Sequence, residues 1–133
     1  GIHLLIEHTS KLNHLILKNF IPLFIPPLYI HSLTIQEWKY WNDVEKFCSI
    51  FSHIKSLRID VWSIEMMIKL IDRLKYLEYV VFWYNIDKYL PFISMRWLKR
   101  TFYRLRREKF TYQIGDYYLL LSIGKKQNRN NKL

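Results

Sequence analysis

Apolar residues recur along the chain in four short segments that share one spacing. Each segment has large apolar side chains at its first, fourth and sixth positions, in the pattern L-x-x-L-x-L. The four sets are Leu12, Leu15 and Leu17; Ile30, Leu33 and Ile35; Ile54, Leu57 and Ile59; and Leu77, Val80 and Phe82. Alternation of apolar and other residues is typical of a strand with one buried face, so each segment predicts a short strand.

The spacing between these segments is nearly regular. Successive copies begin 18, 24 and 23 residues apart, at positions 12, 30, 54 and 77. This spacing brackets the period of leucine-rich repeats, about 20–29 residues, in which each unit buries its apolar face only by stacking on its neighbours. The pattern therefore predicts an α/β fold: a short leucine-rich-repeat-like solenoid with a parallel sheet on the concave side and helices outside.

Segments between the predicted strands carry apolar residues at helical spacing. Residues 64–74 have an i, i+3, i+4, i+7 stripe behind Ser63, a residue type favoured at helix N-caps, and residues 40–51 have a similar stripe. Residues 21–29 contain three prolines, which lack a backbone donor and break helices. We expect two outer helices and one extended connection.

The chain changes character after the fourth predicted strand. Residues 95–105 show a third helical stripe, whose other faces are strongly basic. Residues 110–114 and 117–123 alternate around Gly115-Asp116, which predicts a β-hairpin with a type II′ turn. A basic helix and a β-hairpin would thus cap the sheet. Residues 125–133 lack apolar periodicity and predict a disordered basic tail.

Length and composition fit one domain, placed at residues 1–124. The chain has 133 residues, half of them hydrophobic, which is enough for one continuous core. It begins with Gly1, which suggests a fragment of a longer protein. The longest apolar stretch, residues 21–30, is too short for a membrane span and is broken by prolines.

The single cysteine, Cys48, excludes an internal disulfide framework and any cluster of cysteine metal ligands. It lies on the apolar stripe of the 40–51 helix, where a buried and inert thiol is expected rather than a catalytic one. This cysteine usage fits a reducing compartment, the cytoplasm or the nucleus.

Positive charge is concentrated at one end of the chain. Residues 1–95 contain ten Lys and Arg against nine Asp and Glu, whereas residues 96–133 contain eleven against two. Clustered cations raise the local potential and favour anionic partners, among them acidic proteins and nucleic acids.

The residues between the apolar repeat positions are the candidates for contact with a partner. In a parallel solenoid they point away from the core and line the inner face of the sheet. Tyr, Trp and Arg are common among the residues that dominate binding energy. The predicted partner-binding residues are Lys18, Gln36, Arg58, Asp60, Tyr79 and Trp83. A structural alternative is that Tyr79 and Trp83 instead pack against the terminal hairpin.

Several segments together resemble a known family. "LNHLIL", "IHSLTI", "IKSLRIDVWSIEMMIKLIDRLKYLEYV" and "WLKRTFYRLRREKFTYQIGDYYLLLSIG" are similar to the C-terminal part of F-box proteins with divergent leucine-rich repeats. The resemblance implies the target-holding part of a receptor for a cullin-type ubiquitin ligase. No F-box is visible in these 133 residues, so binding to the ligase adaptor would need an upstream segment.

Catalytic motifs are absent from the sequence, and we expect no enzyme activity, metal or cofactor. The five histidines form no H-E-x-x-H pattern, there is no glycine-rich phosphate loop, and no pair of carboxylates has acid/base spacing. Solvated helix faces explain the isolated acidic residues.

Two further functions stay open beside protein recognition. The basic helix interleaves cations with aromatic residues, a mixture that contacts phosphates and bases, so nucleic-acid or anionic-surface binding through Arg100, Arg104 and Arg107 is the first. The second is a structural repeat fragment without a partner of its own, since a terminal cap also needs a polar outer face.

Overall fold

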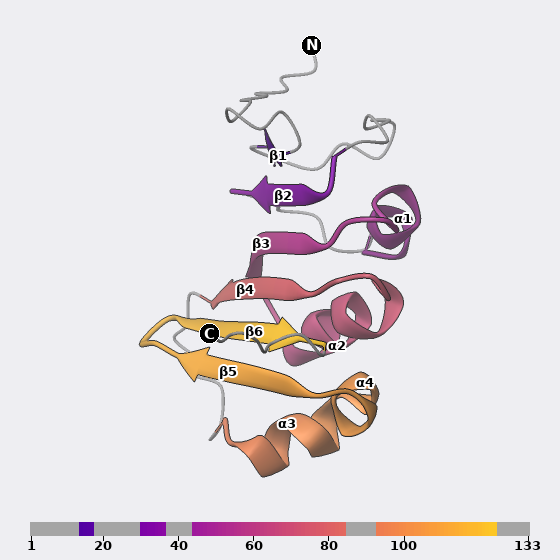
Figure 1. The fold of residues 1–133 in the computed structure, drawn as a ribbon. Coiled ribbons are helices and arrows are strands. Elements are labelled where there is room, and N and C mark those ends of the chain that lie inside the picture. The colour runs from indigo at the N-terminus through magenta and orange to yellow at the C-terminus, as the bar shows by residue number, and fades with distance from the viewer. Residues whose placement is uncertain (1–13, 18–29, 37–43, 85–92, 125–133) are drawn as a thin grey trace, which may run out of the picture.

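A computed structural model describes residues 14–17, 30–36, 44–84 and 93–124, which form an α/β fold with one six-stranded mixed sheet (Figure 1). The elements in chain order are β1 (His14–Leu17), β2 (Ser32–Ile35), α1 (Val44–Ile50), β3 (Ser56–Val61), α2 (Ile64–Arg73), β4 (Tyr79–Tyr84), α3 (Met95–Thr101), α4 (Tyr103–Arg107), β5 (Phe110–Ile114) and β6 (Tyr118–Ile123). The spatial order of the strands is β1-β2-β3-β4-β6-β5.

The first four strands are parallel neighbours, and their register follows the repeat. Leu15 pairs with Leu33, Leu33 with Leu57, and Leu57 with Val80. These four residues therefore lie side by side in one row across the four parallel strands. The predicted parallel sheet with helices between its strands is therefore confirmed for the described residues. β6 then pairs antiparallel to β4, and β5 to β6, so the C-terminal hairpin extends the sheet beyond β4, as expected for a cap.

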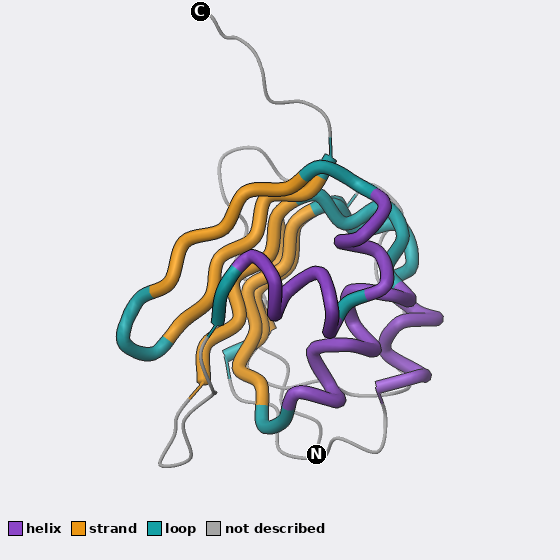
Figure 2. The backbone as a smooth tube through the Cα atoms, turned by 90° about the horizontal axis from the view of Figure 1, so that it is seen from below, coloured by secondary structure: helices purple, strands orange, loops and turns teal. Residues whose placement is uncertain are grey.

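The core lies between one face of the sheet and the helices (Figure 2). Side chains alternate along the strands, and the buried set includes Leu33, Leu57, Val80 and Phe82, each fully shielded from solvent. Helices α1 and α2 cover this face with their apolar stripes. None of the described helices covers the opposite face, which Figure 2 shows on the side of the strands away from α1 to α4.

Helix α2 begins where the sequence predicts. Ser63 has extended backbone angles, and its hydroxyl accepts a hydrogen bond from the Met66 N–H at 3.2 Å. This satisfies one of the N–H groups that a helix start leaves without a partner. The buried residues Met67, Leu70 and Ile71 lie on the predicted stripe.

The prediction of one continuous basic helix over residues 95–105 is wrong. Phe102 has an extended backbone (φ −110°, ψ 115°) and separates α3 from α4. Leu98, Phe102 and Leu105 are all fully buried across the break, as their helical spacing predicts, and the Phe102 ring lies edge-on to Trp97 at a centroid distance of 5.9 Å.

The predicted hairpin is confirmed, but its turn lies one residue later than expected. The Gly115 N–H donates to the Tyr118 carbonyl at 2.9 Å, which leaves Asp116 and Tyr117 as the turn residues. The predicted type II′ turn starting at Gly115 is wrong. Such a turn needs a positive φ at Gly115, whereas among the described glycines only Gly124 has one. Gly115 is instead placed where a Cβ atom would overlap the Tyr118 ring.

Three sequence predictions lie outside the described residues: the extended connection at 21–29, the tail at 125–133 and the partner contact at Lys18. Within the described ranges, no helix has the length and apolar character needed to cross a membrane.

Candidate functional site: the open face of the sheet

The sheet face opposite the helices is the candidate site, and we call it the open face. Strand register places one set of side chains on it: His14, Ile16, Ser32, Thr34, Ser56, Arg58, Asp60, Tyr79, Val81, Trp83, Thr111, Gln113, Tyr118, Leu120 and Ser122. Most are polar or aromatic, in contrast to the apolar residues that alternate with them. This composition suits a surface that meets solvent in the free protein and a partner in a complex.

Arg58 and Tyr79 form the centre of the open face. The Arg58 guanidinium lies over the Tyr79 ring, with its carbon 5.6 Å from the ring centroid, and Arg58 is exposed. Val81, opposite Arg58 in the ladder, is only 3% exposed, although it also lies on this face. Larger neighbours on the same face thus bury it, and the centre of the site is a packed surface.

Trp83 forms an aromatic pair with the C-terminal hairpin. It lies opposite Asp60 on β3 and Tyr118 on β6, and the Trp83 and Tyr118 rings have a centroid distance of 5.1 Å. The Tyr118 hydroxyl accepts a hydrogen bond from the Gln113 side chain at 3.0 Å. Trp83 nevertheless stays 43% exposed, so contact with the hairpin and availability to a partner occur together.

Two more exposed aromatic residues lie at the same end of the sheet and were missed by the sequence analysis. Trp62 follows the last residue of β3 and is 67% exposed, and Tyr117 in the hairpin turn is 62% exposed. Tyr84 on β4 links the two, because it pairs with Val61 and its N–H donates to the Tyr117 carbonyl at 2.8 Å. The sequence could have indicated Trp62, because it continues the alternation of Arg58 and Asp60 along the strand and so belongs to the same face.

The β1 end of the open face is polar. His14 contacts Ser32 through Nδ1 at 2.5 Å and Thr34 through Nε2 at 3.2 Å. Burial, followed by the nearby Arg58 charge, lowers the pKa of His14 below its usual value of 6.5. The imidazole is therefore neutral at pH 7, with one ring nitrogen donating and the other accepting.

The structure brings four of the six predicted partner-binding residues together. Arg58, Asp60, Tyr79 and Trp83 lie on the adjacent strands β3 and β4 of the open face. Gln36 directly follows β2 and is exposed.

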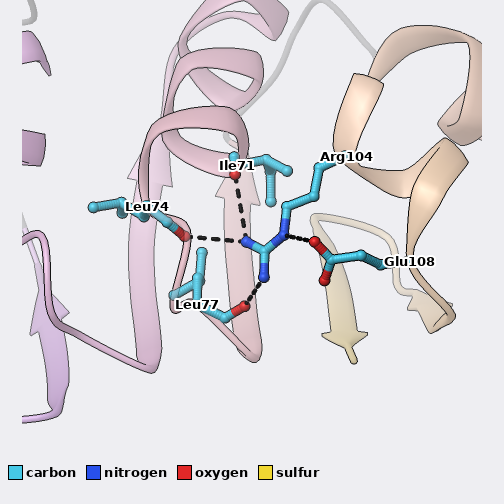
Figure 3. Close-up of polar contacts among 5 residues, drawn as sticks. All are labelled: Ile71, Leu74, Leu77, Arg104 and Glu108. Carbon is cyan, nitrogen blue, oxygen red and sulfur yellow. Dashed lines mark hydrogen bonds and ion pairs between the residues drawn. The ribbon is translucent and has the colours of Figure 1, made fainter. Parts of the chain in front are cut away.

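Of the three predicted anion-binding residues, Arg100 and Arg107 are exposed, but Arg104 is not (Figure 3). The Arg104 side chain is 11% exposed and points toward the end of α2. Its guanidinium donates to the carbonyl oxygens of Ile71, Leu74 and Leu77, at 3.4, 3.0 and 2.7 Å, and to the Glu108 carboxylate at 2.9 Å. We therefore assign Arg104 to holding α4 against α2 and remove it from the anion-binding candidates.

Potential metal ligands in the described ranges do not gather into one site. No group of three or more His, Cys, Asp or Glu side chains there could hold a metal ion. Burial, followed by the Glu45 charge, raises the pKa of Cys48 to about 12. The buried thiol is therefore protonated near neutral pH and is a poor nucleophile.

Comparison with known proteins identifies no relative of this chain. No protein family, curated protein or solved structure matches it. Its function is therefore inferred from its own residues.

Proposed function

We propose that this chain is a protein-recognition module that binds its partner through the open face. In this proposal, the four parallel strands and their crossover helices are degenerate leucine-rich repeats in a short solenoid, and the hairpin is its cap. The support is the recurrence of strand and helix from β2 to β4, with the repeat leucine positions in register. Stacked repeats of this kind characteristically present one extended sheet face to a partner.

The observation that carries the proposal is the position of Arg58, Tyr79 and Trp83. These residues lie on two neighbouring central strands, on the face that no described helix covers. Arg, Tyr and Trp are the types most enriched among residues that dominate binding energy. The sheet fixes the backbone at these positions, so only side chains need to be ordered when a partner binds, which limits the entropic cost.

The size of the expected effect follows from this arrangement. Truncating a central aromatic or Arg contact in an interface typically costs about 2 kcal/mol or more, roughly a thirtyfold loss in affinity. Replacing Arg58 and Trp83 by Ala should therefore abolish capture of a micromolar partner. Neither residue belongs to the buried core, so the fold should survive the replacement.

The F-box resemblance gives this proposal a cellular setting. The open face would hold a protein target for ubiquitination, in the cytoplasm or nucleus, while an F-box elsewhere in the same polypeptide would bind the ligase adaptor. A partner with acidic residues suits the exposed guanidinium of Arg58 at the centre of the face.

Site-specific photocrosslinking tests the proposal. In the full-length protein, p-benzoylphenylalanine is placed at Ser56 or Ser122, which lie opposite Tyr79 on the open face, and, as a control, at Lys46 or Glu65, which are exposed residues of α1 and α2. The same protein should be crosslinked from both open-face positions and from neither helix position. That crosslink should disappear in an Arg58→Ala variant and persist in Lys55→Ala.

Two outcomes would reject the proposal. Crosslinking to one protein from the helix positions alone would place the interface on the other side of the sheet. No crosslink from any position would favour a structural fragment without a partner.

A further inference from the structure

A second surface, separate from the open face, lies on the two C-terminal helices. Exposed residues occur at i, i+3 and i+4 in both, which places three side chains together on one side of each helix. We call these two neighbouring patches together the basic face. Its residues are Arg96, Lys99 and Arg100 of α3 with Tyr103, Arg106 and Arg107 of α4. Five of the six are Arg or Lys.

Two guanidiniums of the basic face are arranged around one exposed aromatic ring. The Arg106 and Arg107 guanidinium carbons lie 5.3 and 5.6 Å from the Tyr103 ring centroid. Arg107 also donates a hydrogen bond from Nη1 to the Tyr103 hydroxyl at 3.1 Å. The ring is 56% exposed, so planar cationic and aromatic groups meet solvent side by side.

The positive charge of the basic face is not neutralised within its own helices. Glu108 is the one acidic residue between positions 95 and 109. Its carboxylate accepts a hydrogen bond from Arg104, whose guanidinium points away from this face toward α2. The five outward cations therefore have no carboxylate partner on α3 or α4.

The backbone that carries the basic face is firmly anchored. Leu98, Phe102 and Leu105 are fully buried beneath the two helices. Arg104 adds hydrogen bonds to the carbonyls of Leu74 and Leu77. Because the scaffold is fixed, ligand binding would order only side chains, which limits the entropic cost of binding.

We propose that the basic face binds single-stranded nucleic acid. Guanidiniums match the geometry of phosphate oxygens, and both guanidinium planes and the Tyr103 ring can stack on an unpaired base. An acidic protein segment would use the charge but not the aromatic plane, and a duplex keeps its base faces hidden. The mixture of four arginines with an exposed tyrosine therefore favours an unpaired strand over either of these polyanions.

Fluorescence anisotropy with a labelled 15-nucleotide oligouridylate tests this proposal on the intact chain. Arg106→Gln/Arg107→Gln is compared with the control Lys46→Gln/Lys55→Gln, which removes the same charge from exposed residues outside α3 and α4. The slope of log affinity against log salt should become shallower by about 1.4 in the first variant, because each phosphate contact contributes about 0.7. Between 50 and 200 mM NaCl these contacts account for about a sevenfold change in affinity. The control should retain the wild-type slope.

Tyr103 variants separate stacking from charge. Tyr103→Leu should weaken binding at least about fivefold with little change in the salt slope, whereas Tyr103→Phe should bind nearly as well as the wild type. Three results would overturn the proposal: no binding at 50 mM NaCl, equal losses in the two double variants, or equal competition by polyglutamate or by a duplex of the same length.

Discussion

Arg104 is predicted to be a major support of the C-terminal half of the fold. It is a largely buried cation on α4 whose hydrogen-bond acceptors are carbonyls at the end of α2 and just before β4. The last carbonyls of a helix have no partner within the helix and carry partial negative charge. Replacing Arg104 by Met keeps most of the side-chain volume and removes all of these bonds.

The expected loss can be worked out from the contacts. The bonds to Leu74 and Leu77, at 3.0 and 2.7 Å, have good distances, and a hydrogen bond to a charged group contributes about 1.5–3 kcal/mol. The 3.4 Å contact to Ile71 is weak, and the Glu108 carboxylate is 42% exposed, so its ion pair adds little. Two such bonds contribute about 3–6 kcal/mol, and the lower end applies because the Leu74 carbonyl keeps a second donor, the Leu77 N–H. We therefore expect Arg104→Met to lower the free energy of unfolding by about 3 kcal/mol.

Urea unfolding followed by tryptophan fluorescence measures this change. In thermal unfolding, the same loss of about 3 kcal/mol should lower the melting temperature by roughly 10 °C in a domain of this size. Arg100→Met is the matched control, because Arg100 is exposed on α3, and it should change stability by less than about 0.5 kcal/mol. Glu108→Gln should cost less than about 1 kcal/mol.

Equal stability of the Arg104→Met and Arg100→Met proteins would refute this reasoning. It would mean that water satisfies the Leu77 carbonyl equally well when the guanidinium is removed, and that the Leu77 N–H, which donates to the Leu74 carbonyl at 3.0 Å, is a sufficient partner for Leu74. An Arg104→Lys variant should lose only part of this stability. An ammonium group cannot reach both carbonyls in the way that the planar guanidinium does. The Lys variant should therefore lie between the wild type and Arg104→Met.

Three further predictions concern other parts of the fold. Ser63→Ala should destabilise the protein by about 1 kcal/mol in urea unfolding through loss of the α2 cap, whereas Ser49→Ala, at an exposed position of α1, should change little. Cys48 should react with a thiol reagent at pH 8 only in denaturant, because its raised pKa and burial keep it protonated and shielded; fast labelling of the folded protein would contradict this. Gly115→Ala should displace the Tyr118 ring and reduce the near-ultraviolet circular dichroism of the aromatic pair, and an unchanged spectrum would show that the close approach is not needed.

The strands and their register could be predicted from the sequence because alternation has a local and unambiguous period. Leu33 and Leu57 alternate with polar residues, and shifting either strand by one position would expose its apolar set. The signal in β4 is weaker, because Val81 beside Val80 is also apolar and buried. The same alternation predicted that Arg58 and Trp83 would share a face. Ser63 also signalled its helix correctly, because N-capping depends on residues close in sequence.

The features that sequence reasoning missed depend on contacts between distant residues. The helical stripe correctly predicted a buried Phe102 but did not reveal that the helix breaks there, where Phe102 has an extended backbone. Arg104 has the same spacing as its exposed neighbours, and only the position of α2 distinguishes it from them. The hairpin turn lies one residue later than predicted, and the close approach of the Tyr118 ring to Gly115 is a packing feature that turn propensities do not report.

Arg104 also connects the two proposed binding surfaces. Its guanidinium holds α4, which carries half of the basic face, to the Leu77 carbonyl, two residues before Tyr79 on the open face. A variant of Arg104 should therefore weaken nucleic-acid binding and partner binding together, through the fold. Variants of exposed residues should distinguish the two activities. Arg107 variants should weaken only nucleic-acid binding by the basic face, and Trp83 variants only partner binding by the open face. A loss of both activities in either of these variants would mean that one ligand spans both surfaces.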